Sequence, residues 1–218
     1  MISRGAVVLL SAVAVVLGCA VVARSGAPPV GSAVYVVRPD LRLCPSPMCG
    51  GYWVALANHA RTKCADGLRR PACYVAKVVD EDRRPLETGI PSGALARADV
   101  EETTYQGIGK LGVLVAADVF SSAGRGARSG RFFRLVDTGV RCIRAPCFSI
   151  RASLINRSSR TTVSGIQSVG GVVPERLVKR VETALDTKSG ILAQGRMAPS
   201  IDGGREFLAT RFFLRSER

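Results

Sequence analysis

The pattern of apolar and polar residues predicts short β-strands at two corresponding places in this chain. Residues 149–154 run Ser-Ile-Arg-Ala-Ser-Leu, an alternation that gives a strand one apolar and one polar face. Residues 52–56 run Tyr-Trp-Val-Ala-Leu in the same phase, which puts Trp53 on the face opposite Val54. Because a slip of one residue would turn the apolar set to solvent, the shared phase indicates that both strands pack alike.

The two strands belong to a duplication that extends beyond them. The hexapeptide Cys-Pro-Ser-Pro-Met-Cys at 44–49 recurs as Cys-Ile-Arg-Ala-Pro-Cys at 142–147, and the same offset carries Asn58 onto Asn156. Each hexapeptide follows a strand-like run that contains aromatic residues and precedes an alternating strand. We expect both asparagines to bond the local backbone of a strand end or turn.

These features predict a mainly β protein of the α+β class, built from two tandem repeats at 33–122 and 131–218. Each repeat is expected to run strand, strand, strand, helix, strand, strand. The order resembles that of a five-stranded barrel of the oligonucleotide- and oligosaccharide-binding type. Strand order in space does not follow from the sequence, so a single sheet or barrel built from both repeats is equally allowed.

One clear helix is predicted near 174–189, in the second repeat. Pro174 suits the first turn, Gly190 suits the C-terminal cap, and the apolar residues between them fall at helical spacing. The first repeat has only a weak equivalent near 92–101. Between the repeats, 121–130 is rich in Gly, Ser and Arg and is expected to be a linker or a hairpin loop.

The beginning of the chain has the pattern of a targeting segment. An apolar run covers 6–23, which fits the hydrophobic region of a signal peptide and also the shortest span of a bilayer. The run contains Val-Leu-Gly-Cys, which resembles a lipobox and predicts Cys19 as a lipidation site. Residues 1–24 are therefore expected to be a signal peptide, a lipid anchor or an uncleaved membrane helix, followed by a tether at 25–32. Each alternative places the protein in the cell envelope or outside the cell.

The number of cysteines agrees with export. There are seven, and setting Cys19 aside leaves six, an even number suited to disulfides in an oxidising compartment. With one histidine and no Cys-x-x-Cys pair, a zinc site or a thioredoxin-type redox pair is disfavoured. The second repeat has no match to the pair at 64 and 73. The short separations favour three local disulfides, namely Cys44–Cys49, Cys64–Cys73 and Cys142–Cys147.

A longer pattern surrounds these cysteines. It includes Tyr-Val-Val-Arg-Pro-Asp at 35–40, Cys-x-x-Pro-x-Cys-Gly-Gly at 44–51, Cys-Ala-Asp-Gly at 64–67 and Arg-Cys-x-x-x-Pro-Cys at 141–147. In these residues the chain resembles an uncharacterised domain family of exported bacterial proteins. The resemblance implies a location in the envelope and a shared fold, and it implies no reaction.

The net charge of +14 raises the question of an anionic partner. The excess is almost entirely arginine, and the arginines are scattered, without a basic run or interleaved aromatic residues. GC-rich coding explains such an excess at least as well as a dedicated polyanion site does. The sequence therefore predicts no specific nucleic-acid partner.

The residues that could support catalysis are few. His59 is the only imidazole, and the acidic cluster at 80–82 precedes two arginines and a proline, as expected of a solvated turn. No phosphate-binding glycine loop is present, and neither a cofactor nor a metal is expected. The one residue singled out for binding is Trp53, which could stack on a sugar or a partner.

The favoured hypothesis is an exported, non-enzymatic envelope protein that binds a partner protein or an envelope polymer and is held to the membrane through its N-terminus. The alternative is a secreted protease inhibitor that presents residues 45–47 or 143–145 as a cysteine-braced bait loop. A hydrolase built around His59 is a third hypothesis, for which the sequence offers no constellation.

Overall fold

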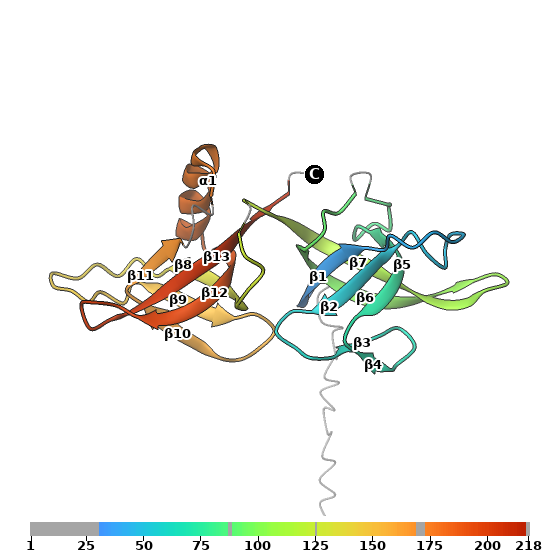
Figure 1. Cartoon of the computed structure of the whole chain (residues 1–218), viewed down its shortest axis with the longest axis horizontal. Helices are drawn as coiled ribbons and strands as arrows, with labels where there is room; N and C mark the ends of the chain where they lie inside the picture. The colour runs from blue at the N-terminus through green and yellow to red at the C-terminus, as the bar shows by residue number, and fades with distance from the viewer. Residues whose placement is uncertain (1–30, 87–88, 125, 169–172, 217–218) are drawn as a thin grey trace, which may run out of the picture.

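The computed structural model separates the chain into two groups of strands that lie side by side (Figure 1). Residues 33–122 form the first half, on the right of Figure 1, and residues 131–216 form the second half, on the left. The segment 1–24 with Cys19, and the tether up to residue 30, lie outside the described residues. The structure describes 31–86, 89–124, 126–168 and 173–216.

The strands of the first half pair in a closed cycle. Strand β1 pairs antiparallel with β2 and β6, β2 pairs with β5, and β5 pairs in parallel with β7, which returns to β6. A small separate ladder joins β3 to β4. The strands are β1 (Ala33–Pro39), β2 (Tyr52–Leu56), β3 (Thr62–Lys63), β4 (Arg69–Arg70), β5 (Cys73–Val79), β6 (Ala94–Tyr105) and β7 (Gly109–Ser122).

The second half has the same order of pairings. Strand β8 pairs with β9 and β12, β9 pairs with β10, and β12 pairs with β13. Only Ser164 separates β10 from β11, and β11 pairs with β13 in parallel, as β5 does with β7. The elements are β8 (Arg131–Asp137), β9 (Ile150–Leu154), β10 (Arg160–Val163), β11 (Gly165–Ser168), α1 (Glu175–Asp186), β12 (Ile191–Pro199) and β13 (Arg205–Arg215).

Each half encloses its own apolar core, and a third cluster fills the junction. The inward residues of the alternating strands form the first core, where Val37 and Val54 are fully buried. Phe207 and Leu135 are likewise fully buried in the second core. At the junction Phe213 is 1% exposed, and burial of such a side chain contributes roughly 2 kcal/mol.

The pairing of β13 with β7 joins the two halves into one 11-stranded sheet, which includes every described strand except β3 and β4. Two asparagines also connect the halves, by reciprocal hydrogen bonds. The side chain of Asn58 accepts from the N–H of Phe132 (2.9 Å) and donates to its carbonyl (2.7 Å). The side chain of Asn156 does the same with Val34, at 2.9 Å and 2.7 Å. Both residues have a left-handed backbone, with φ of 63° and 57°. The expectation that they bond the local backbone is therefore wrong, because their amides bond the backbone of the first strand of the opposite half.

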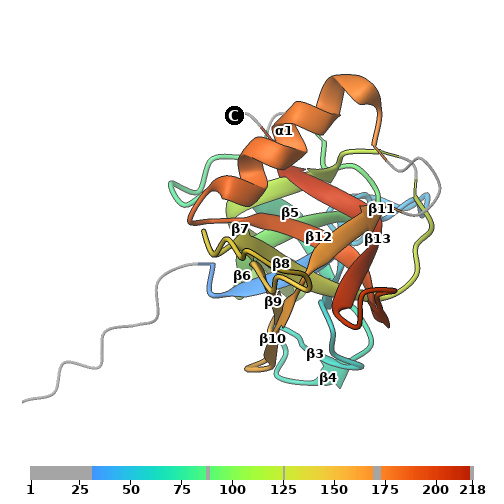
Figure 2. The same ribbon diagram turned by 90° about the vertical axis from the view of Figure 1, so that its left-hand side faces the viewer.

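The helix prediction holds in one half only. Helix α1 covers Glu175–Asp186 and lies across one side of the second half, where its apolar face packs on the core (Figure 2). The weak helix expected at 92–101 is wrong, because residues 94–101 lie in β6. There Ala94, Ala96 and Ala98 face the first core, and pairing with strands on both sides outweighs the helix propensity of alanine.

Candidate functional site

The two cysteine hexapeptides lie in corresponding loops at opposite ends of the molecule. The loop 40–51 joins β1 to β2 at the right of Figure 1, and the loop 138–149 joins β8 to β9 at the left. Each loop contains a cis proline. The disulfides are the local pairs that the spacing favours: Cys44–Cys49, Cys64–Cys73 and Cys142–Cys147, with Cα atoms 5.6, 5.3 and 5.5 Å apart.

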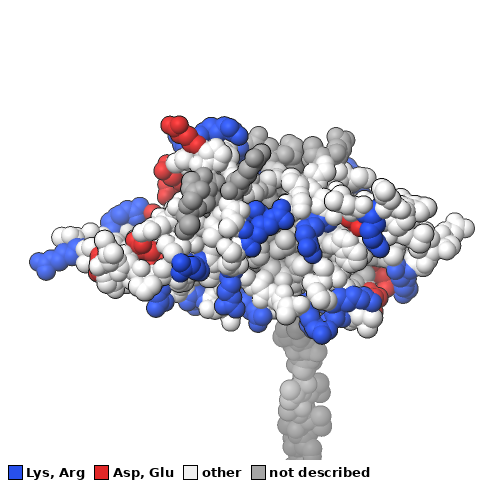
Figure 3. Space-filling view, in the orientation of Figure 1, with Lys and Arg blue, Asp and Glu red and all other residues white. Residues whose placement is uncertain are grey.

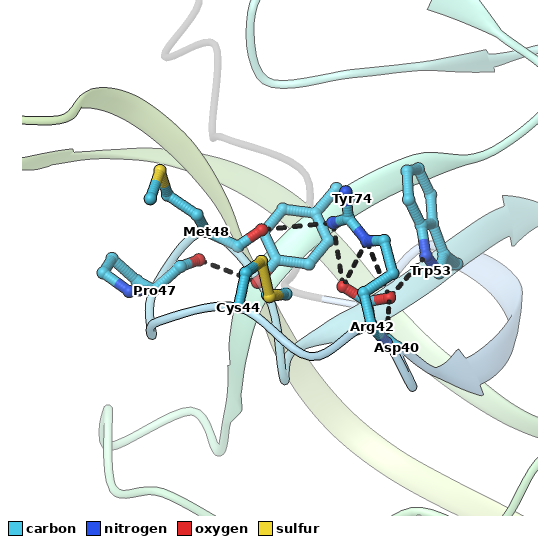
Figure 4. Close-up of polar contacts among 8 residues, drawn as sticks. Asp40, Arg42, Cys44, Pro47, Met48, Trp53 and Tyr74 are labelled. Carbon is cyan, nitrogen blue, oxygen red and sulfur yellow. Dashed lines mark hydrogen bonds and ion pairs between the residues drawn. A yellow bond between two sulfur atoms is a disulfide. The ribbon is translucent and has the colours of Figure 1, made fainter.

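The first loop is fixed to the sheet by a cluster around Asp40, which we call the Trp53 cluster. It consists of Asp40, Arg42, Trp53 and Tyr74, which Figure 4 shows, and of Tyr105, whose charge would influence Tyr74. The carboxylate of Asp40 is almost fully buried and accepts hydrogen bonds from the guanidinium of Arg42 at 2.8 to 3.0 Å. It also accepts a bond from the indole N–H of Trp53 at 3.3 Å. One carboxylate therefore holds both the loop and the aromatic strand.

The guanidinium of Arg42 lies against two aromatic rings. Its central carbon is 5.2 Å from the ring centre of Trp53 and 5.3 Å from that of Tyr74, within the range of a cation–π contact. The two rings meet edge to face, 5.6 Å apart. Arg42 also donates to the carbonyl of Met48 at 3.1 Å, so the cation braces the disulfide loop against β2 and β5.

The electrostatics of the Trp53 cluster favour a fixed ion pair. The hydrogen bonds from Arg42 hold the pKa of Asp40 below its usual value, and the same bonds raise the pKa of Arg42. The pair is therefore ionised and close to neutral overall. A site of this kind offers polar groups and ring faces without a strong net charge.

Two tyrosine hydroxyls complete the cluster. The hydroxyl of Tyr74 donates to the carbonyl of Pro47 at 2.7 Å, and burial raises its pKa. Burial also raises the pKa of Tyr105, at the end of β6. The hydroxyl oxygen of Tyr105 is buried and has no hydrogen-bond partner among the described residues. Such a group is available to a ligand or a water molecule.

The second loop shares the ion pair of the first and lacks its aromatic surface. Asp137 ends β8, and both of its carboxylate oxygens accept bonds of 3.0 Å from Arg141. On β9 the position that corresponds to Trp53 is Arg151. Ile143 projects fully into solvent from this loop. The two disulfide loops therefore have a similar backbone arrangement and ion pair but present different side chains to solvent.

The other residues considered for catalysis have structural contacts. His59 has its Nε2 2.9 Å from the carbonyl of Asn156, at the junction of the halves. Asp80 accepts bonds from the backbone and side chain of Arg84 within one turn, which lowers its pKa. Across the described ranges no cluster of His, Cys, Asp or Glu could hold a metal ion. In the same ranges no helix is long and apolar enough to cross a membrane.

The sequence pointed to Trp53 and missed its neighbours. Arg42 lies within the motif that surrounds the first cysteine pair, and an Asp-x-Arg spacing beside a loop cysteine could have suggested an ion pair. Tyr74 and Tyr105 come from strands far along the chain, and only the pairing of β2 with β5 brings Tyr74 beside Trp53. No local pattern reports that contact.

The family comparison covers the described region almost entirely. Residues 33–218 match the model of a domain of unknown function, DUF6748. The chain belongs to this family. The match begins at the first residue of β1 and includes both halves. No curated protein and no solved structure matches the chain.

Proposed function

We propose that this member of the DUF6748 family is an exported, non-enzymatic binding protein that recognises an envelope glycan through the Trp53 cluster. The observation that carries the proposal is the set of aromatic rings and polar groups on β2, β5 and the disulfide loop. Trp53 and Tyr74 supply aromatic rings, and the half-exposed guanidinium of Arg42, whose charge the buried Asp40 neutralises, supplies donors. Sugar rings carry apolar faces and hydroxyls, so this combination suits them better than it suits a charged ligand.

The pairing order supports a specific architecture for this role. We propose that each half is a closed five-stranded barrel and that the halves are copies of one unit. The cycle β1, β2, β5, β7, β6 has the order of the barrel that binds oligonucleotides and oligosaccharides. In that barrel, ligands lie over the second and third strands between two loops, which here correspond to β2, β5, loop 40–51 and the β6–β7 turn.

The proposed location follows from the N-terminal segment and the cysteines. A cleaved signal, a lipid on Cys19 or an uncleaved helix would each deliver the domain to an oxidising space, where the three disulfides persist. Mass spectrometry of the protein isolated from membranes tests this directly. An acyl mass on Cys19 or a new N-terminus near residue 24 supports export, and an unprocessed chain with reduced cysteines contradicts it.

The binding proposal can be tested with the fluorescence of Trp53, which is the only tryptophan in the chain. Titration with soluble peptidoglycan fragments and neutral envelope oligosaccharides should shift its emission. Trp53→Ala should reduce co-sedimentation with insoluble cell-wall material roughly tenfold, since loss of one aromatic stacking contact costs about 1–3 kcal/mol.

Phe148→Ala provides the matched control. Phe148 is an exposed aromatic residue in the second cysteine loop, so its removal deletes similar apolar surface far from the Trp53 cluster. Binding should survive this change. If both variants bind cell-wall material as well as the wild type does, the Trp53 cluster is not the binding site.

One observation favours protease inhibition as a second candidate. Leu43 and Ile143 beside the two disulfides are fully exposed, with relative accessibilities of 103% and 104%. A braced loop with an exposed side chain is a suitable shape for insertion into a protease cleft. The test is a panel of serine and cysteine proteases assayed with the wild type and with Ile143→Asp. Inhibition that the substitution abolishes would support this candidate, and no inhibition of any protease would remove it.

A further inference from the structure

A second candidate site lies beside α1, on a different part of the molecule from the Trp53 cluster. A hollow of about 500 Å³ separates the helix from the end of β13. Among the described residues its lining includes four cationic side chains and no acidic one: Arg176, Lys179, Arg180 and Arg215. From this arrangement we propose that the hollow binds the phosphate groups of a soluble anionic polymer. This site does not depend on the glycan-binding proposal above.

The acidic and basic residues of α1 lie on adjoining sides of the helix, with Lys179 next to the acidic side. At 100° per residue, Arg176, Lys179 and Arg180 lie on one side with Thr183 between them, and this is the side that lines the hollow. The acidic residues Glu175, Glu182 and Asp186 lie on another side. The apolar residues Leu177, Val181, Ala184 and Leu185 form the third side and pack on the second core.

Part of this pattern is that of an ordinary solvated helix, because Lys179 stands four residues after Glu175 and three before Glu182, spacings at which opposite charges stabilise a helix. Arg176 and Arg180 are like charges four residues apart, and no acidic residue of α1 stands three or four residues from either of them. The hydrogen bonds from Asp137 chiefly raise the pKa of Arg141 in the second loop, and the charge of Asp186 adds to this effect. Arg176, Lys179 and Arg180 therefore line the same side of the hollow, where one bound anion would contact all three.

The opposite wall holds a further cation in place. Asp118 on β7 is almost completely buried and forms ion pairs with Arg97 and Arg215. The side chain of Arg215 is nevertheless 67% exposed, so the buried carboxylate fixes its position without removing it from solvent. The hydroxyls of Ser121 and Ser216 lie next to this wall, 2.9 Å apart.

Phosphate fits this donor set better than carboxylate does. A carboxylate is planar and is satisfied by one guanidinium fork, whereas a phosphate group presents three acceptor oxygens in different directions. The hollow offers cations from two separate elements together with hydroxyl donors. Figure 3 shows that Lys and Arg are also spread over much of the visible face, so a polymer with several phosphates could extend beyond the hollow.

The test compares the purified full chain with two double variants of equal net charge. Arg176→Gln with Lys179→Gln removes two cations from the hollow. Lys63→Gln with Arg160→Gln removes one lysine and one arginine from exposed positions elsewhere. Binding of sodium polyphosphate of defined length is measured at several salt concentrations, and thermal unfolding shows that both variants fold.

The hollow variant should bind polyphosphate about tenfold or more weakly, and the slope of log Kd against log salt should fall by about 1.5. The control variant should remain within about twofold of the wild type. Equal losses in both variants would mean that only net charge matters, and would overturn the site. If polygalacturonate binds as tightly as polyphosphate does, the preference for phosphate is overturned. If phosphatidylglycerol vesicles bind more tightly than polyphosphate does, the proposed ligand is a lipid surface and not a soluble polymer.

Discussion

Removal of one junction asparagine should destabilise the fold more than its partly exposed position suggests. In Asn156→Ala three hydrogen bonds disappear, those to the N–H and carbonyl of Val34 and the one to the carbonyl of Ala57 at 3.0 Å. At about 1 kcal/mol each, the loss is about 3 kcal/mol. Alanine at a φ of 57° adds about 1 kcal/mol of backbone strain, for a total near 4 kcal/mol.

Asn156→Gly separates these two contributions. Glycine adopts the left-handed backbone without strain, so this variant should lose only the bonds and should be about 1 kcal/mol more stable than Asn156→Ala. Urea unfolding followed by Trp53 fluorescence and by far-ultraviolet circular dichroism gives both free energies. Trp53 lies in the first half, so it reports on a part of the molecule that Asn156 itself does not belong to.

The double variant Asn58→Ala with Asn156→Ala adds a test of reciprocity. If the junction opens once either asparagine is lost, the double variant should lose less free energy of unfolding than the sum of the losses in the two single variants. A loss below 1 kcal/mol in Asn156→Ala would refute the reasoning, since it would mean that water replaces all three bonds without cost.

Three further predictions concern the disulfides, the loop glycines and pH. Replacing Cys64 and Cys73 by serine should cost about 2.5 kcal/mol of loop entropy plus lost core packing, against about 2 kcal/mol for Cys142 and Cys147, as measured by urea midpoints. Gly51→Ala should destabilise the fold by roughly 3 kcal/mol, because the new Cβ would lie 2.2 Å from the carbonyl oxygen of Val75. In Gly50→Ala the new Cβ meets no neighbour, and the positive φ should cost only about 1 kcal/mol. Equal melting temperatures of the two variants would contradict this reasoning. Arg42 lowers the pKa of Asp40, so the Asp40 carboxylate stabilises the fold at pH values above its unfolded pKa of 3.8. This contribution is lost as the pH falls through the lower pKa of the folded state. The free energy of unfolding should therefore decline less steeply with acid in Asp40→Asn than in the wild type.

The sequence predicted those features that a single strand or loop encodes. The phase of residues 52–56 correctly placed Val54 in the core and Trp53 on the other face, because alternation reports directly which side is buried. The short cysteine separations favoured the pairs that the structure contains. Helix α1 was predicted from its apolar spacing, but the prediction of Gly190 as its C-terminal cap is wrong, because the helix ends at Asp186 and Thr187 is the C-cap.

The features that the sequence did not predict depend on contacts between distant segments. Residues 92–101 have helix-forming alanines, and only the neighbouring strands β1 and β7 determine that they form β6. The same limit applies to the asparagines, since local pattern indicates a turn and is silent about Phe132 and Val34. The Trp53 cluster likewise required the register between β2 and β5, which no spacing along the chain encodes.

The reciprocal asparagines also determine what kind of object the protein can engage. They tie each half to the first strand of the other, and β13 pairs with β7 across the same junction, so the two disulfide loops lie at opposite ends of the molecule (Figure 1). Two such loops cannot close on a single small ligand, as the jaws of a clamp would. A target that occupies both of them must be long enough to run the length of the molecule, or must be two separate bodies that the protein keeps a set distance apart.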